Sequence, residues 1–142
     1  MTQTHEAVLR RDGFLLLYTK GVSMEPMLHE GREQSLIYPL VTSPKKNDVI
    51  LFRRKNGDLV LHRVVGKRGE GYILRGDNCY GSELVSLSQM LGRLEGYYTQ
   101  DRYVDCHKDR AYKRYVFRRN LSYPLRCFVP YFRRKLSRLM RK

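Results

Sequence analysis

The sequence predicts a mainly β domain followed by a basic, helical C-terminal tail. Asn-Gly lies between two strand-like runs, "DVILFRR" and "LVLHRVV", and this pattern is a strong hairpin signal. The charge is uneven as well, because residues 108–142 contain 13 Lys/Arg and one acid whereas residues 1–107 contain 15 Lys/Arg and 13 acids. We therefore divide the 142-residue chain into a near-neutral β domain, 1–107, and a cationic tail, 108–142.

The first part of the domain is expected to hold one helix and two strands. Residues 5–11 predict a short helix that stops at the following Asp-Gly. The apolar run that starts at Phe14 predicts a buried strand leading to Ser23, and residues 35–40 predict a second short strand. A loop with proline and two lysines follows at 42–48.

Residues 48–76 predict a three-stranded meander with its first turn at Asn-Gly. Alternation along the second strand places His62 on one face together with Val60 and Val64. The next segment, "SELVSLSQMLG", is compatible with a helical turn or an irregular loop. Residues 92–98 then predict a closing strand.

The cysteines and the apolar runs indicate the cellular compartment in which the protein is expected. Its three cysteines are widely spaced and form no CxxC pair, as expected in a reducing compartment. The longest apolar run near the start, "FLLLY", is far shorter than the roughly 20 residues that cross a bilayer. We expect a cytoplasmic location, and since the histidines lack metal-ligand spacing we expect neither a metal nor a cofactor.

Three residues are candidates for chemistry, although each has an ordinary structural interpretation. Ser23 and Asp77 both lie in turn-like sequences, where their side chains commonly bond nearby backbone. His62 lies on an apolar strand face, where a histidine is usually a satisfied core residue. Their significance comes from their combination.

Three ordered blocks resemble the signal peptidase I family of serine peptidases and the related self-cleaving LexA-type repressors. The blocks are "GVSMEPMLHEG" (21–31), "NDVILF...LVLHRVVG" (47–66) and "YILRGDNC" (72–79), and the resemblance extends more faintly to "LGRLEG". It implies a mainly β peptidase fold with Ser23 as the nucleophile. Bacterial members use a lysine base, whereas the archaeal and endoplasmic-reticulum branch uses histidine, so the resemblance implies His62 as the base here.

The chemistry agrees with that assignment. A serine hydroxyl is a weak nucleophile until a neighbouring base takes its proton, and histidine can do so near neutral pH. A third group must hold the imidazole in the right tautomer. On the family pattern Asp77 is the first candidate for this role, with Glu83 in the following loop as the reserve.

The residues around Ser23 suggest how the substrate is held. Gly21 tolerates backbone shapes that let a substrate approach closely, and Pro26 stiffens the corner beyond the serine. The backbone N–H of Ser23 is positioned to donate to a developing oxyanion. Met24 is expected under the bend, with a place in the substrate pocket as the alternative.

The chain departs from both related groups. Residues 1–22 contain no membrane-spanning segment and no helix-turn-helix, which the two groups carry before their peptidase domains. We therefore expect a hydrolase that trims a precursor peptide or protein from the cytosol or from the cytosolic membrane surface. The alternative is an inactive peptidase-like binding module that acts through its basic tail.

The tail predicts an amphipathic helix from Pro130 onward. Its apolar positions are Phe132, Leu136, Leu139 and Met140, and lysines and arginines occupy much of the rest. Such a helix could dock on the domain, lie on an anionic membrane surface, or bind nucleic acid through its charge. We rank nucleic acid last, because the tail carries no nucleic-acid fold signature.

Overall fold

The computed structural model describes residues 4–139 of the chain, with side chains left out at 127–135, 138 and 139. Two compact units divide between Asp109 and Arg110. The boundary expected from the charge distribution lies slightly earlier, after residue 107. No helix among the described residues is long and apolar enough to cross a membrane.

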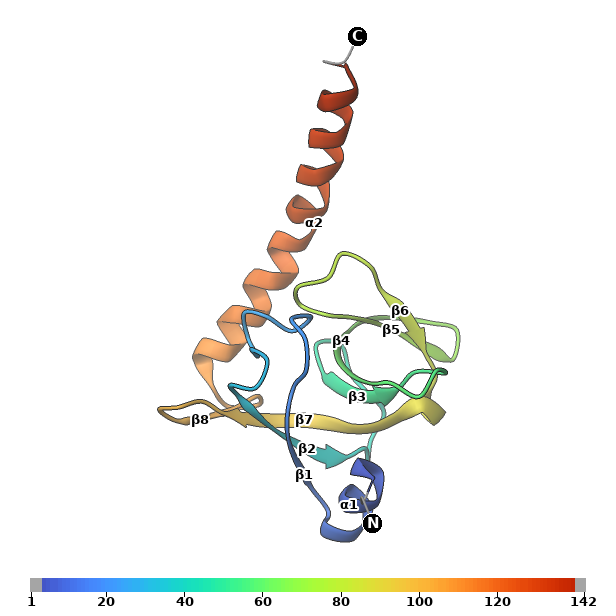
Figure 1. Cartoon of the computed structure of the whole chain (residues 1–142), viewed down its shortest axis with the longest axis vertical. Helices are drawn as coiled ribbons and strands as arrows, with labels where there is room; N and C mark the ends of the chain where they lie inside the picture. The colour runs from blue at the N-terminus through green and yellow to red at the C-terminus, as the bar shows by residue number, and fades with distance from the viewer. Residues whose placement is uncertain (1–3, 140–142) are drawn as a thin grey trace. The chain divides into compact units, whose positions relative to one another are not determined.

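The first unit is mainly β, as predicted. Its elements are α1 (His5–Asp12), β1 (Leu15–Tyr18), β2 (Gln34–Pro39), β3 (Val49–Arg53), β4 (Leu59–Arg68), β5 (Gly71–Arg75), β6 (Glu83–Val85), the 3-10 turn η1 (Leu87–Gln89), β7 (Met90–Tyr98) and β8 (Tyr103–Asp105). The strands form one antiparallel sheet in the order β1-β2-β7-β3-β4-β5-β6, with β8 paired to β7. This sheet curls strongly from β3 to β6 (Figure 1).

Helix α1 has well-defined ends. The Thr4 side chain accepts a hydrogen bond from the backbone N–H of Ala7, and Gly13 ends the helix in the left-handed region at φ 75°. Leu9 is the buried residue of the helix, and α1 contacts β1 and β2. The predicted short helix is therefore confirmed, and it anchors the edge of the sheet from which the chain runs to Ser23.

The β3–β4 hairpin forms the centre of the domain, as predicted from the Asn-Gly turn. His62 pairs with Ile50 across the hairpin, and its ring meets Phe52 edge-on with centroids 5.9 Å apart. The core around it consists of buried apolar residues from β3 to β7, namely Ile50, Phe52, Val64, Tyr72, Leu74, Val85 and Met90. Strand β4 is buried on both faces at its middle, where Arg63 is only 2% exposed.

Two short strands differ from the expectation. The segment "SELVSLSQMLG" contains β6, which pairs with β5 so that Glu83 lies opposite Leu74. Within this segment the helical turn η1 is limited to Leu87–Gln89. Strand β8 was not expected and pairs with the end of β7. Both strands have three residues, and such strands form because a partner strand is present rather than from their own propensity.

The second unit is helix α2 (Arg110–Leu139), which begins well before the predicted start at Pro130. The helix continues through Pro124 and Pro130, although a proline inside a helix removes one hydrogen-bond donor. Of the expected apolar face, Leu136 is described and exposed. The side chains of Phe132, Leu139 and Met140 lie outside the described residues.

Candidate active site

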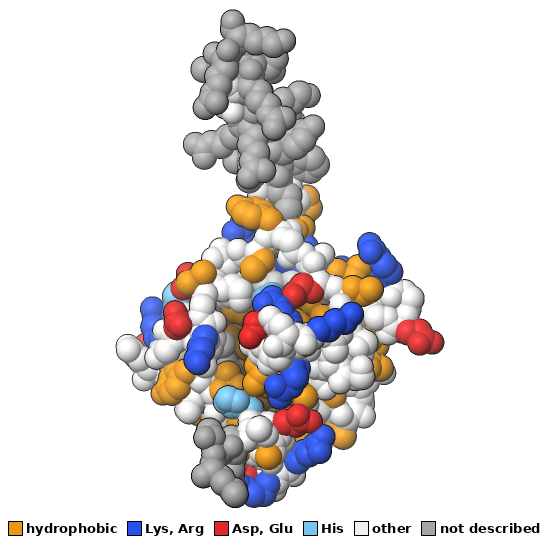
Figure 2. Space-filling view, turned by 45° about the vertical axis from the view of Figure 1, so that its right-hand side comes forward, with side chains coloured by type: hydrophobic (Ala, Val, Ile, Leu, Met, Phe, Trp, Pro, Cys, Tyr) orange, Lys and Arg blue, Asp and Glu red, His pale blue; other side chains and the backbone are white. Residues whose placement is uncertain are grey.

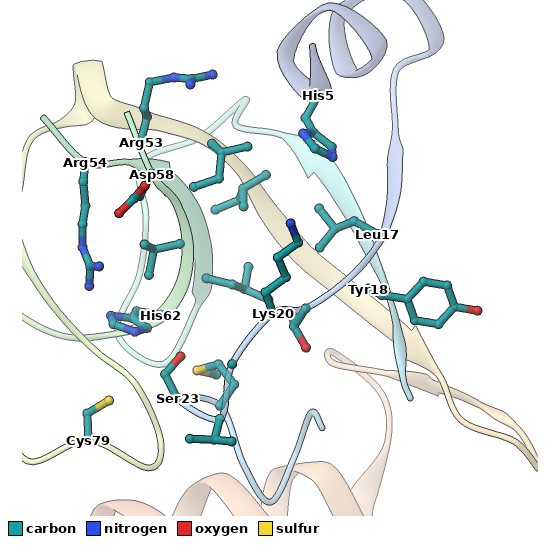
Figure 3. A pocket seen from close by; sticks show the side chains of 18 of the residues that line it. His5, Leu17, Tyr18, Lys20, Ser23, Arg53, Arg54, Asp58, His62 and Cys79 are labelled. Atoms are coloured by element: carbon teal, nitrogen blue, oxygen red, sulfur yellow. The ribbon is translucent and has the colours of Figure 1, made fainter. Parts of the chain in front are cut away.

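A pocket of about 700 Å³ lies between the segment that follows β1 and the β3–β4 hairpin. Ser23 and His62 both line it, together with Gly21, Met24 and Cys79. Figure 3 shows the Ser23 hydroxyl pointing toward the side where the His62 ring lies next to it. Two residues 39 positions apart in the sequence, both singled out above, are thereby brought to the same end of one pocket.

Ser23 begins a tight turn after the β1 strand. Gly21 has φ 76°, a left-handed conformation that side-chain-bearing residues rarely adopt, so it directs the chain into the turn. Met24 is 2% exposed and also lines the pocket, which combines the two places considered for it. Pro26 is exposed and is not among the described residues lining the pocket, so it shapes the turn only.

Asn78 ties this turn to the loop after β5. Its backbone N–H donates to the carbonyl oxygen of Ser23 at 2.8 Å, and its side-chain amide donates to the carbonyl oxygen of Val22 at 3.1 Å. Asn78 thus binds the carbonyl oxygens of two successive residues, Val22 and Ser23. These two hydrogen bonds, which we call the Asn78 clamp, fix the position of the Ser23 backbone relative to the loop after β5.

Gly76 allows the two loops to come this close. A Cβ added at Gly76 would lie 2.6 Å from the carbonyl oxygen of Ser23, 2.7 Å from Cys79 Sγ and 3.1 Å from His62 Nε2. Real Cβ atoms do not tolerate such contacts, so only glycine fits here. The same distances place His62 Nε2 on the side of the ring that faces the Ser23 turn.

His62 is well buried at the middle of β4, with 5% exposure. Burial lowers its pKa from the usual 6.5, since desolvation disfavours the imidazolium, and the nearby Arg54 guanidinium adds to this effect. The carboxylates of Glu83 and Asp77 act in the opposite direction. The net lowering of the pKa keeps the imidazole neutral at pH 7, the form that can accept a proton.

Glu83 is the acid beside the other ring nitrogen. Its Oε2 lies 3.3 Å from His62 Nδ1, a distance that is long for a charge-assisted hydrogen bond. Arg54 holds the same carboxylate with two hydrogen bonds, at 2.6 Å from Nε and 3.0 Å from Nη2. A chain of contacts therefore runs from Arg54 through Glu83 to His62.

Asp77 has a different partner. Both of its carboxylate oxygens accept hydrogen bonds from Arg63, each at 2.8 Å, and the two side chains are 2% and 4% exposed. Asp77 is also not among the described residues that line the pocket. Of the two acids left open for orienting His62, the structure brings Glu83 to the imidazole and commits Asp77 to Arg63.

Sequence reasoning missed the residues that support this site. Asn78 was quoted within a motif but given no function, and neither Arg54 nor Arg63 was considered. The signal for Arg63 was available, because an arginine in the apolar alternation of "LVLHRVV" needs a buried acid. The pairing of Arg54 with Glu83 spans 29 residues and has no local signal.

No cluster of three or more metal-ligating side chains occurs among the described residues. No protein-family model matches the chain, and no curated protein matches it significantly. The resemblance to signal peptidase and LexA-type peptidases therefore rests on the three sequence blocks alone.

Proposed function

We propose that this protein is a serine endopeptidase with Ser23 as nucleophile, His62 as general base and Glu83 as the residue that orients His62. The observation that carries the proposal is the direction of the Ser23 hydroxyl toward a buried imidazole whose far nitrogen lies 3.3 Å from a carboxylate. A nucleophile, its base and an orienting acid in series are what activation of a serine requires.

The proposed reaction uses an acyl-enzyme. The Ser23 oxygen attacks the peptide carbonyl carbon while its proton passes to His62 Nε2, and the same proton then goes to the departing amine as the C–N bond breaks. A water molecule, deprotonated by His62, hydrolyses the ester and restores the Ser23 hydroxyl. Glu83, whose Oε2 lies 3.3 Å from His62 Nδ1, stabilises the imidazolium that forms in each half.

The backbone also supports this chemistry. The N–H of Ser23 has no acceptor among the described residues, which leaves it available to donate to the oxyanion of the tetrahedral intermediate. The edge strand β1, which leads into the pocket, pairs with β2 on one side only. An extended peptide can pair with its other side, as peptides commonly do at sheet edges. A peptide or protein substrate suits this groove.

The proposal is tested by comparing protein N-termini in cells that express the wild type or Ser23→Ala at equal levels. We expect N-termini that depend on Ser23 and identify both the substrate and the cleavage site. Cys79→Ala is the matched control, since the Cys79 thiol lies in the same pocket and close to His62 Nε2. Equal N-termini with both proteins folded, or loss of cleavage in Cys79→Ala but not in Ser23→Ala, would refute the assignment.

A second candidate function is a binding module that acts through α2. It is favoured by Phe117, Leu121 and Leu125, which recur every four residues and are 66–68% exposed on a helix whose sequence contains no acid. A basic helix with an exposed apolar stripe suits an anionic membrane surface. Sedimentation with phosphatidylserine vesicles tests this candidate; binding by Ser23→Ala that is lost when 110–142 is removed would support it.

A further inference from the structure

The pocket has a second end, away from Ser23, that carries positive charge. Lys20, in the segment after β1, and Arg53, at the end of β3, line it and supply the two cations, and His5 of α1 lines it as a neutral neighbour. Figure 3 shows the Lys20 amine pointing away from Ser23 toward the His5 side of the space. Asp58 is the one carboxylate among the described lining residues. Figure 2 shows lysines and arginines (blue) among hydrophobic side chains (orange) on the surface of the first unit.

The charged side chains at this end differ in whether they already have an ion-pair partner within the protein. Lys20 is exposed and makes no ion pair within residues 4–139. Arg53 lies 3.7 Å from Glu6, but Glu6 is held at 2.7 Å by Arg10. The Asp58 carboxylate accepts one hydrogen bond from the neutral Asn56 side-chain amide at 2.9 Å and keeps its charge, so it offsets one of the two cations. A net positive charge therefore remains open to a ligand.

We propose that this basic end is a subsite for a carboxylate side chain of an extended peptide, with Lys20 as its main contact. Apolar residues beside it, Leu17, Val60 and Leu61, also line the pocket and suit uncharged neighbours in the same peptide. Cleavage of that peptide rests on the proposed function, whereas its binding does not. The protein thus selects acidic peptides by charge, a few residues from the bond that Ser23 would attack.

The expected preference is modest because the site is partly solvated. Exposed ion pairs of this kind correspond to roughly a fivefold tighter binding at most, and salt weakens them. Replacing Lys20 by an acid should therefore remove the preference and turn it toward a peptide with lysine at the same position. Salt should reduce the preference of the wild type in parallel.

The test measures binding to full-length Ser23→Ala, which cannot use Ser23 to cleave. Short fluorescein-labelled peptides carry a single glutamate at successive positions, each compared with its glutamine equivalent by fluorescence anisotropy. We expect one position to favour glutamate by a factor of up to about five, with the preference lost in the added variant Lys20→Gln and inverted in Lys20→Glu. Lys46→Glu changes the net charge equally from an exposed site outside the pocket and should retain the preference.

The outcomes separate the subsite from the peptidase. No glutamate preference at any position, or a preference equally reduced by Lys46→Glu, overturns the subsite whether or not the wild type cleaves peptides. A preference that depends on Lys20 supports the subsite even where no cleavage follows, and in that case only the proposed peptidase activity fails. Thermal unfolding of each variant verifies that the compared proteins are folded.

Discussion

Two arginine–carboxylate pairs flank His62, and they differ in exposure. Arg63 and Asp77 are 2% and 4% exposed, and Arg63 is further held by the carbonyl of Asn47 at 2.9 Å. Arg54 and Glu83 are 39% and 34% exposed, and their carboxylate also reaches the imidazole. The first pair is enclosed and joins two loops, while the second remains accessible and can respond to the charge of His62. Burial therefore separates the enclosed pair from the accessible pair that also contacts His62.

Breaking the buried pair should have the largest effect on stability. Asp77→Asn leaves the Arg63 guanidinium buried without a counter-charge, and we expect a loss of about 3–5 kcal/mol in the free energy of unfolding. Urea denaturation measures it. Replacing both residues by apolar ones of similar size should cost much less, because no charge is then left buried. A loss below about 1 kcal/mol for Asp77→Asn would contradict the structural role of this pair.

Replacing Glu83, the acid of the accessible Arg54–Glu83 pair, should affect activity more than stability. Glu83→Gln keeps the shape but removes the charge beside His62 Nδ1, and we expect kcat/KM to fall roughly tenfold to a hundredfold. Since Glu83 raises the pKa of His62, the acid limb of the pH profile should move to lower pH. An unchanged rate and profile would remove Glu83 from the proposed mechanism.

Arg54→Gln should give a smaller loss with the opposite pH shift. Arg54 lowers the pKa of His62, so its removal should move the acid limb of kcat/KM to higher pH, with a rate loss of roughly threefold to tenfold from a less constrained Glu83. The opposite directions of the two shifts are the diagnostic observation. Shifts in the same direction would mean that the two side chains do not act on the imidazole as the structure places them.

The smallest expected effect is on stability as a function of pH. The folded-state pKa of His62 lies below 6.5, so the unfolded chain binds this proton first as the pH falls. The contribution of neutral His62 is present above pH 6.5 and is lost as the pH falls toward the lowered pKa. Unfolding of the wild type and His62→Gln between pH 7 and 5 measures it. Identical slopes would argue against a depressed pKa.

The sequence predicted most of the strands, the short first helix, and the places of Ser23 in a turn and of His62 on a strand, but not β6, β8 or the order of the strands in the sheet. Alternation, an Asn-Gly turn and motif order are local signals, and local signals predict strands and turns. No local sequence signal decides whether Asp77 or Glu83 lies beside His62. Both follow β5, and only the path of the loop between them, together with the buried Arg63, decides which carboxylate faces the imidazole. Helix α2 also began earlier than its prolines indicated.

The Asn78 clamp has a consequence for the order of events during synthesis. Ser23 leaves the ribosome long before the residues that fix it, since its carbonyl is held by Asn78 and its proposed partners are His62 and Glu83. A nascent chain that ends before β6 contains Ser23 without Glu83, and one that ends before Asn78 lacks the clamp as well. The proposed activation of Ser23 therefore waits until Glu83, 60 residues further along the chain, has been made.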